Sequence, residues 1–145
     1  MDPSPLPAWD PAEVSPLELA LTRDGVESAC FPTLFERGLS LADGGKVQGV
    51  ELSAREARGR VQGGESEPYD VAIGAEPGDA PGPRIGWSTC TCKFAQSNAT
   101  ERSLCKHMAA LALVAGAAYR LEREAAQIAR AAAPAPIGRA PAPRL

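Results

Sequence analysis

The chain has 145 residues, a formal net charge of −3 and 44% hydrophobic residues, of which few are aromatic. This length limits it to about one modest domain, which excludes a large multidomain enzyme. No run reaches the roughly 18 to 20 apolar residues of a membrane helix. The start, Met1 to Pro7, lacks the basic and apolar parts of a secretory signal, so we expect a cytoplasmic protein with no membrane partner.

Charge is distributed unevenly along the chain. Residues 1–45 carry 8 acids and 2 bases, residues 46–110 carry 8 of each, and residues 111–145 carry 2 acids and 5 bases. Only the C-terminal end is basic, whereas a protein that binds DNA unaided presents a broad cationic face. We therefore expect any nucleic-acid binding to be weak and steeply salt-dependent.

Both ends of the chain are rich in proline. Residues 1–16 are predicted to be a disordered lead-in and residues 133–145 a disordered Ala/Pro/Arg tail. A single domain remains over residues 17–132, with its core in residues 30–118. Trp9 is interpreted as a solvated residue of the lead-in, with docking on an unspecified surface as the alternative. The apolar run Leu17 to Leu21 does not reveal its secondary structure.

A helical pattern begins after Pro32. Apolar residues recur there at nearly helical spacing: Leu34, Phe35, Leu39 and Leu41. The pair Gly44-Gly45 ends the pattern, so residues 33–42 are predicted to form a short helix. Cys30 lies just before it, and burial as a small apolar residue is favoured over a role as a fifth metal ligand.

The middle of the chain alternates polar and apolar residues with a period of two. Residues 46–53, 56–62 and 69–74 are predicted strands, and the short gaps between them favour an antiparallel meander over βαβ units. Residues 84–92 are a further predicted strand, and residues 104–132 form the longest helical pattern, which Pro134 ends. The predicted fold is α+β: a short N-terminal helix, a small antiparallel sheet of three to four strands, and a knuckle that joins the last strand to a long C-terminal helix.

The knuckle contains three of the four cysteines and the only histidine, as Cys90-x-Cys92 and Cys105-x-His107. Residues two apart in a strand project to the same face, so Cys90 and Cys92 can reach one ion. Residues two apart in an α-helix differ by about 200° in direction, so Cys105 and His107 share an ion only if the helix begins near Cys105. Ser103 is the candidate N-cap. The prediction is one structural Zn²⁺ with a Cys3His ligand set.

Other chemistries fit these four residues less well. Disulfides are disfavoured because Cys-x-Cys pairs bridge poorly, and an iron–sulfur cluster, the second metal interpretation, would colour the protein red-brown. A catalytic zinc keeps an open coordination position, and no second histidine is present for acid–base chemistry. We therefore expect no enzymatic activity, with a redox role of Cys90-x-Cys92 as a minor alternative.

The ligand pattern, with its second pair opening a helix, resembles a SWIM zinc finger. Bacterial stand-alone SWIM proteins are similar over about residues 30–118, and share three further segments: Phe35-Glu-Arg-Gly38, Tyr69-Asp-Val71 and Cys105-Lys-His-Met-Ala-Ala110. The gap between the ligand pairs, residues 93–104, is longer and more polar than in the familiar bacterial version. No glycine or proline follows Cys92.

The resemblance implies a binding module, which in bacteria often accompanies a helicase-type ATPase. The chain has no Gly-x-x-x-x-Gly-Lys-Ser/Thr loop, so it is not that ATPase itself. We expect a non-catalytic adaptor for a protein partner, with Leu121 and Ile128 on the long helix as interface candidates. The alternative is an accessory nucleic-acid-binding finger. It would use six bases around the metal and along the helix: Lys93, Arg102, Lys106, Arg120, Arg123 and Arg130.

Overall fold

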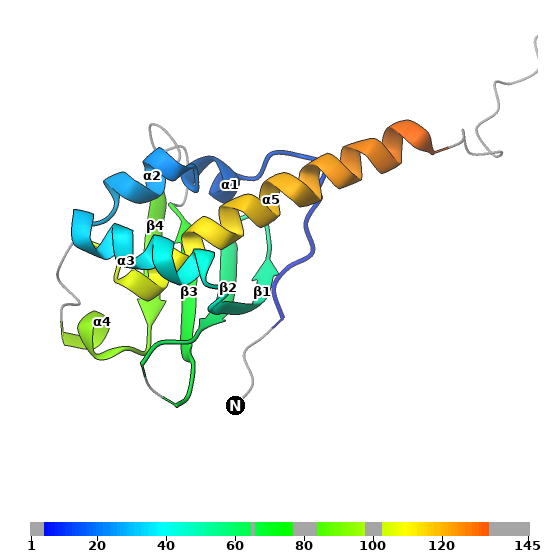
Figure 1. Cartoon of the computed structure of the whole chain (residues 1–145). Coiled ribbons are helices and arrows are strands. Elements are labelled where there is room, and N and C mark those ends of the chain that lie inside the picture. Colours follow the sequence, from blue (N-terminus) through cyan, green and yellow to red (C-terminus); the bar gives the residue numbers. More distant parts are fainter. Residues whose placement is uncertain (1–4, 65, 77–83, 98–102, 134–145) are drawn as a thin grey trace, which may run out of the picture.

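The computed structural model describes residues 5–64, 66–76, 84–97 and 103–133. Figure 1 shows its long C-terminal helix crossing one face of a four-stranded sheet. The elements in chain order are α1 (Pro16–Ala20), α2 (Arg23–Ser28), α3 (Pro32–Asp43), β1 (Val47–Leu52), β2 (Glu56–Val61), β3 (Tyr69–Ala75), β4 (Ile85–Cys90), α4 (Lys93–Ser97) and α5 (Lys106–Ala132). The predicted α+β fold is confirmed. Most of the predicted C-terminal tail and the start of the predicted lead-in lie outside the described residues.

The sheet is the predicted antiparallel meander, with strand order β1-β2-β3-β4. Side chains that alternate toward the helices are buried, namely Ala57, Val61, Val71 and Ile73. This alternation fixes the register, because a shift by one residue would turn the apolar set toward solvent. Gly49, with φ of +62°, forms a bulge in the edge strand β1 where the pairing shifts.

Helix α5 crosses the covered face of the sheet and supplies most of the helical part of the core. Its alanine- and leucine-rich first half is buried from His107 to Ala112. Gly38 of α3 lets the two helices cross closely, since a Cβ at that position would lie 2.5 Å from the Cβ of Ala109. The segment Phe35-Glu-Arg-Gly38, which is part of the family resemblance, therefore has a packing role. None of the described helices combines the length and the apolar character that crossing a bilayer requires.

Tyr119 anchors α5 to the sheet. Its side chain is fully buried, and its hydroxyl donates a hydrogen bond of 2.6 Å to the carbonyl oxygen of Ser53, in the turn between β1 and β2. The C-terminal part of α5 projects past the sheet, as Figure 1 shows. The residues predicted to be interface candidates, Leu121 and Ile128, are 66% and 69% exposed on this projecting part.

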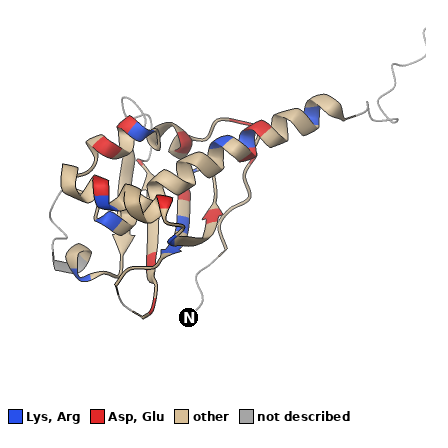
Figure 2. Ribbon diagram, viewed as in Figure 1, with Lys and Arg blue, Asp and Glu red and all other residues tan. Residues whose placement is uncertain are grey.

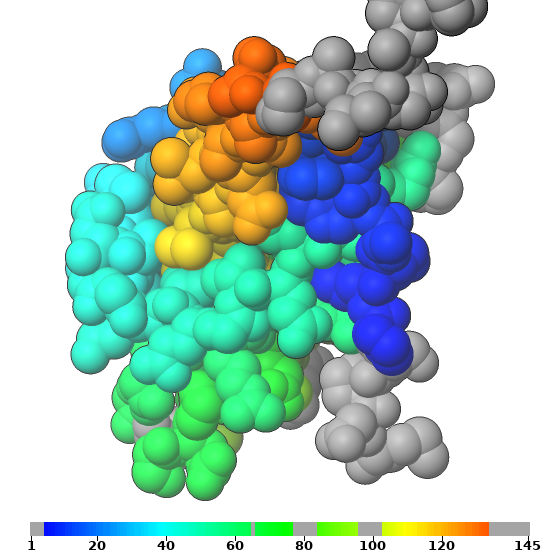
Figure 3. Space-filling view, turned by 90° about the vertical axis from the view of Figure 1, so that its right-hand side faces the viewer, coloured from blue at the N-terminus to red at the C-terminus, as the bar shows by residue number. Residues whose placement is uncertain are grey.

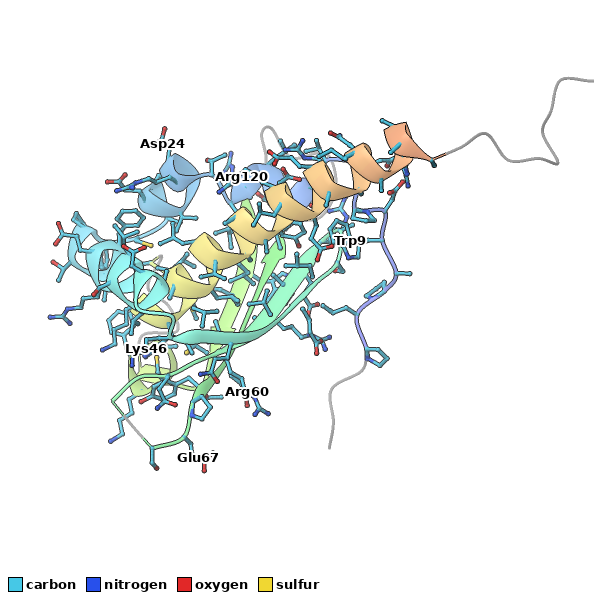
Figure 4. The ribbon with its side chains drawn as sticks, turned by 45° about the vertical axis from the view of Figure 1, so that its right-hand side comes forward. Trp9, Asp24, Lys46, Arg60, Glu67 and Arg120 are labelled. Atoms are coloured by element: carbon cyan, nitrogen blue, oxygen red, sulfur yellow. The ribbon has the colours of Figure 1, made fainter. Side chains whose placement is uncertain are left out.

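The N-terminal segment lies along the projecting part of α5. The apolar run of undecided structure is helix α1, capped by the Ser15 hydroxyl, which accepts from the backbone N–H of Glu18. Trp9 is docked, contrary to the preferred interpretation, because its ring meets Tyr119 edge-on at a centroid distance of 5.4 Å. Figure 4 labels Trp9 where it lies beside the sheet and α5. Docking removes a large aromatic surface from water, which a solvated lead-in would leave exposed.

Candidate metal centre

The four residues singled out by their spacing lie together at the junction of the sheet and α5. One potential ligand atom from each of Cys90, Cys92, Cys105 and His107 can be chosen so that all four lie within 4.8 Å of one another. All four side chains are buried, none more than 9% exposed. Cys30 is not part of this group and is half-buried.

The first pair is placed by the end of β4. Cys90 pairs with Val71 across the sheet and faces the helices, whereas Cys92 lies beyond the strand, in the turn before α4. The expectation that both thiols leave one strand face is therefore wrong for Cys92. The turn itself directs its sulfur: the backbone N–H of Ala95 donates to Cys92 Sγ at 3.4 Å. Helix α4 begins at Lys93, directly after Cys92, where the sequence has no glycine or proline.

The second pair straddles the start of α5. Cys105 is the N-cap, with extended backbone at φ −73° and ψ 169°, and His107 is in the first turn. Because Cys105 is not itself helical, Cys105 and His107 do not have the separation of about 200° that two helical residues at this spacing would have. Cys105 Sγ accepts from the backbone N–H of Met108 at 3.4 Å. The assignment of Ser103 as N-cap is wrong, because the cysteine fills that position.

Residues just before Cys105 are fixed to the junction of α2 and α3. Ser103 Oγ accepts from the backbone N–H of Phe31 at 3.0 Å, and the backbone N–H of Leu104 donates to the carbonyl of Ala29 at 3.0 Å. These bonds come from residues far away in the sequence. They set the point at which α5 begins and hence the position of the Cys105 sulfur.

His107 presents one ring nitrogen to the sulfurs. Nδ1 lies 3.8 Å from Cys90 Sγ and 4.0 Å from Cys105 Sγ. The ring stacks on Tyr69 with a centroid distance of 4.4 Å and a tilt of 42°. Nε2 points toward Gly63, where a Cβ would come within 2.9 Å of this nitrogen and 2.6 Å of the Tyr69 ring. Sequence analysis missed both positioning residues, since Gly63 lies in a gap between two predicted strands and Tyr69 was noted only as part of a strand and a family segment.

The electrostatics of the cluster favour a thiolate at Cys105. Its contact with the Cys90 thiol, supported by His107 and the Met108 N–H, lowers the pKa of Cys105. The same shared contact, together with burial, raises the pKa of Cys90. Burial, reinforced by Cys105, raises the pKa of Cys30 to about 11, so this residue stays a neutral thiol. The lowered pKa of Cys105 favours its thiolate form, which is the form of cysteine that binds a metal ion.

These residues fit a zinc ion. Three sulfurs and an imidazole nitrogen are the donor set of structural zinc sites, and soft thiolates select this metal over Mg²⁺ or Ca²⁺. His107 Nε2 has no hydrogen-bond partner, and it is the only such buried side-chain nitrogen or oxygen atom among the described residues. Nδ1 is the ring nitrogen that faces the sulfurs, and it is therefore the nitrogen available to an ion.

The family model of the SWIM zinc finger matches residues 69–116, from the start of β3 to the middle of α5. This chain carries a SWIM zinc finger. Its cofactor is one structural zinc, and the cluster of three cysteines and one histidine lies within the matched residues. Searches of curated proteins and of solved structures gave no match. The SWIM match begins at Tyr69, the residue that stacks on His107.

Proposed function

We propose that the SWIM finger binds its zinc through Cys90 Sγ, Cys92 Sγ, Cys105 Sγ and His107 Nδ1, and that the chain is a non-catalytic cytoplasmic adaptor for a protein partner. The observation that carries this proposal is the convergence of four buried donors. Four protein ligands complete a tetrahedral sphere and leave no open position for a substrate or an activated water.

The metal in this proposal acts as a cross-link. It connects the end of β4, the turn before α4 and the first turn of α5, so it fixes the helix on the sheet. Structural zinc in finger peptides has apparent binding free energies of about 10 to 16 kcal/mol, compared with about 5 to 15 kcal/mol for the total stability of a domain. Loss of zinc should therefore disorganise the surface that a partner recognises.

The surface favours a protein partner. Large apolar side chains are exposed at several places on it: Phe31, Trp87, Leu121 and Ile128. Bases and acids alternate along α5 and across the helices, and Figure 2 shows no continuous basic face on the side in view. Exposed apolar groups within a mixed-charge surface are typical of protein interfaces. A helicase-type ATPase is the partner class that the SWIM resemblance suggests.

Affinity purification tests this proposal. The wild-type chain, a Cys105→Ser variant and an unrelated bait are compared by mass spectrometry, and each captured protein is then tested for direct binding to the purified, zinc-loaded chain. We expect a partner that binds the wild type directly and is lost with Cys105→Ser. The adaptor hypothesis fails if no protein binds the wild type better than the unrelated bait, or if the variant captures the same proteins after losing its zinc.

The alternative function is accessory nucleic-acid binding. Two of its six candidate bases are already engaged: Arg123 binds Glu18 at 2.9 Å and Arg130 binds Asp10 at 2.7 Å. Arg102 lies outside the described residues. With two of the six bases engaged in ion pairs, we expect weak binding that disappears as salt rises. Fluorescence anisotropy with labelled duplex and single strands checks this, and tight binding at physiological salt would reverse the ranking of the two functions.

A further inference from the structure

The projecting part of α5 has one face that the rest of the chain covers. The N-terminal segment lies against this face, as Figure 3 shows where the blue segment meets the end of the helix. Four contacts hold it there: Trp9 with Tyr119, Glu18 with Arg123, the Ala12 carbonyl with Gln127, and Asp10 with Arg130. These helical residues are three or four apart and so share one face.

The opposite face carries an apolar seam. It consists of Ala118, Leu121, Ala125, Ile128 and Ala132, which are spaced three and four residues apart. This is the a/d spacing of a coiled coil. Ala118 is half-buried, but Leu121 is 66% and Ile128 is 69% exposed, so the described residues leave both large side chains of the seam open to solvent. The N-terminal segment cannot cover it, because that segment is bound to the other side of the helix.

We propose that this seam binds the same seam of a second copy of the chain, with the two helices antiparallel. In that orientation, the large side chains of one seam face the small side chains of the identical seam. When Ile128 lies opposite Ala125 of the second copy, Leu121 lies opposite Ala132 of the second copy, so each large side chain meets a small one. Alternating large and small side chains across two helices allow the backbones to approach and the layers to interdigitate.

The charges beside the seam support the same register. Glu122 and Glu124 flank it on its two sides. With Ile128 opposite Ala125 of the second copy, these glutamates lie level with Ala131 and Ala129 of the second copy, so no like charges meet directly. Antiparallel helices also bring opposite ends of their dipoles together. A different apolar helix would need to supply this match of large and small side chains, whereas a second copy contains it.

The interface is small, which sets the expected strength. The thirteen residues from Arg120 to Ala132 extend about 20 Å at 1.5 Å per residue. Two helix ends of this length can bury less than about 1,200 Å² of accessible surface between them. Interfaces of that size are typical of weak, reversible complexes. We therefore expect a dimer that forms with a Kd in the range of roughly 10 μM to 1 mM and is not permanent.

Sedimentation velocity of the zinc-loaded full chain, over a concentration series across that range, tests this inference. The wild type should shift from monomer to dimer with increasing concentration. Ile128→Glu should remain monomeric, because the charge would be buried against Ala125. Leu19→Glu is the matched control, since Leu19 is 51% exposed elsewhere on the surface and should leave the dimer unchanged. Zinc content and circular dichroism verify folding, and Leu121→Glu provides a second seam variant.

A charge-pair exchange tests the antiparallel register. Ala125→Lys should also be monomeric alone, but an equal mixture of Ala125→Lys and Ile128→Glu should form a heterodimer. In that heterodimer one Lys faces one Glu, and the other site keeps the native alanine–isoleucine contact. A wild type that stays monomeric throughout, a dimer that survives Ile128→Glu, or a mixture that stays monomeric would overturn the proposal. Each test uses purified chain alone, so such a failure leaves the adaptor hypothesis standing.

Discussion

Replacing Tyr119 with phenylalanine removes the hydrogen bond that anchors α5 where it leaves the sheet. The ring stays, so its packing and its contact with Trp9 are retained. The carbonyl oxygen of Ser53 loses a bond of 2.6 Å from the Tyr119 hydroxyl, and the carbonyl oxygen of Glu56 loses a weaker one of 3.3 Å. Glu56 keeps its bond of 2.8 Å from the Ser53 N–H. One buried acceptor is therefore left unpaired, which costs about 1 to 3 kcal/mol.

The size of this effect should depend on pH in a defined direction. Burial raises the pKa of Tyr119 above its ordinary value of 10.0, and the bond to Ser53 only partly offsets this. The folded phenol then holds its proton at a pH where the unfolded phenol releases it. Its contribution is complete below about pH 10 and decreases above it by about 1.4 kcal/mol per pH unit, until the folded pKa is reached.

Urea unfolding of the zinc-loaded wild type and Tyr119→Phe, at neutral pH and between pH 10 and 11, measures both effects. The variant should be less stable by about 1 to 3 kcal/mol at neutral pH. This difference should shrink as the pH rises, because only the wild type loses the contribution of the protonated phenol. Groups common to both proteins cancel in the comparison. Equal stability at neutral pH, or a difference that grows at high pH, would refute this account of the anchor.

Two glycine substitutions test the close approaches around the site. Gly38→Ala should lower the melting temperature, because overpacking against Ala109 costs about 1 to 3 kcal/mol, more than the roughly 1 kcal/mol that alanine adds to helix propensity. An unchanged or higher melting temperature would argue against the close crossing of the two helices. Gly63→Ala should weaken zinc binding by about 10- to 100-fold in a chelator competition, because it displaces His107. Gly64→Ala is the control, since a Cβ there meets nothing within 4 Å, and equal affinities for the two variants would contradict the role of Gly63.

Much of the fold follows from periodicity in the sequence. The helix predicted over residues 33–42 is α3, and the segments with period two are β1, β2 and β3. Each of these elements buries one face against the core, so the spacing of its apolar residues indicates whether it is a helix or a strand. The long helix was predictable for the same reason, and Leu121 and Ile128 were separated from its buried part because the helix outruns the sheet.

Short elements were not predictable, because contacts distant in sequence determine them. Helices α1, α2 and α4 have five or six residues each, too few to show a period. Such helices are not stable alone and depend on tertiary packing. Trp9 gave no local signal of docking, since its partner Tyr119 lies on the last helix. The contact between Trp9 and Tyr119 forms only when the fold brings these two distant parts of the chain together.

For the candidate site, too, some features were predictable from the sequence and others were not. Residue type and spacing singled out the three cysteines and the histidine that the structure brings together, because few other side chains bind zinc. The local geometry differed from expectation at Cys92, which follows the strand, and at Cys105, which is itself the N-cap. A thiol is an unusual cap, so the usual preference for serine pointed to Ser103 instead. The supporting contacts of Gly63 and Tyr69 depend on how β3 meets α5.

X-ray absorption at the zinc edge of the purified chain tests the central claim most directly. A closed Cys3His site predicts one zinc per chain, with three sulfur neighbours at about 2.3 Å and one nitrogen at about 2.0 to 2.1 Å. Cys92→Ser should lose the stoichiometric zinc. A zinc ion with an oxygen ligand from water in an open position, or iron in place of zinc, would contradict a metal that only organises a binding surface.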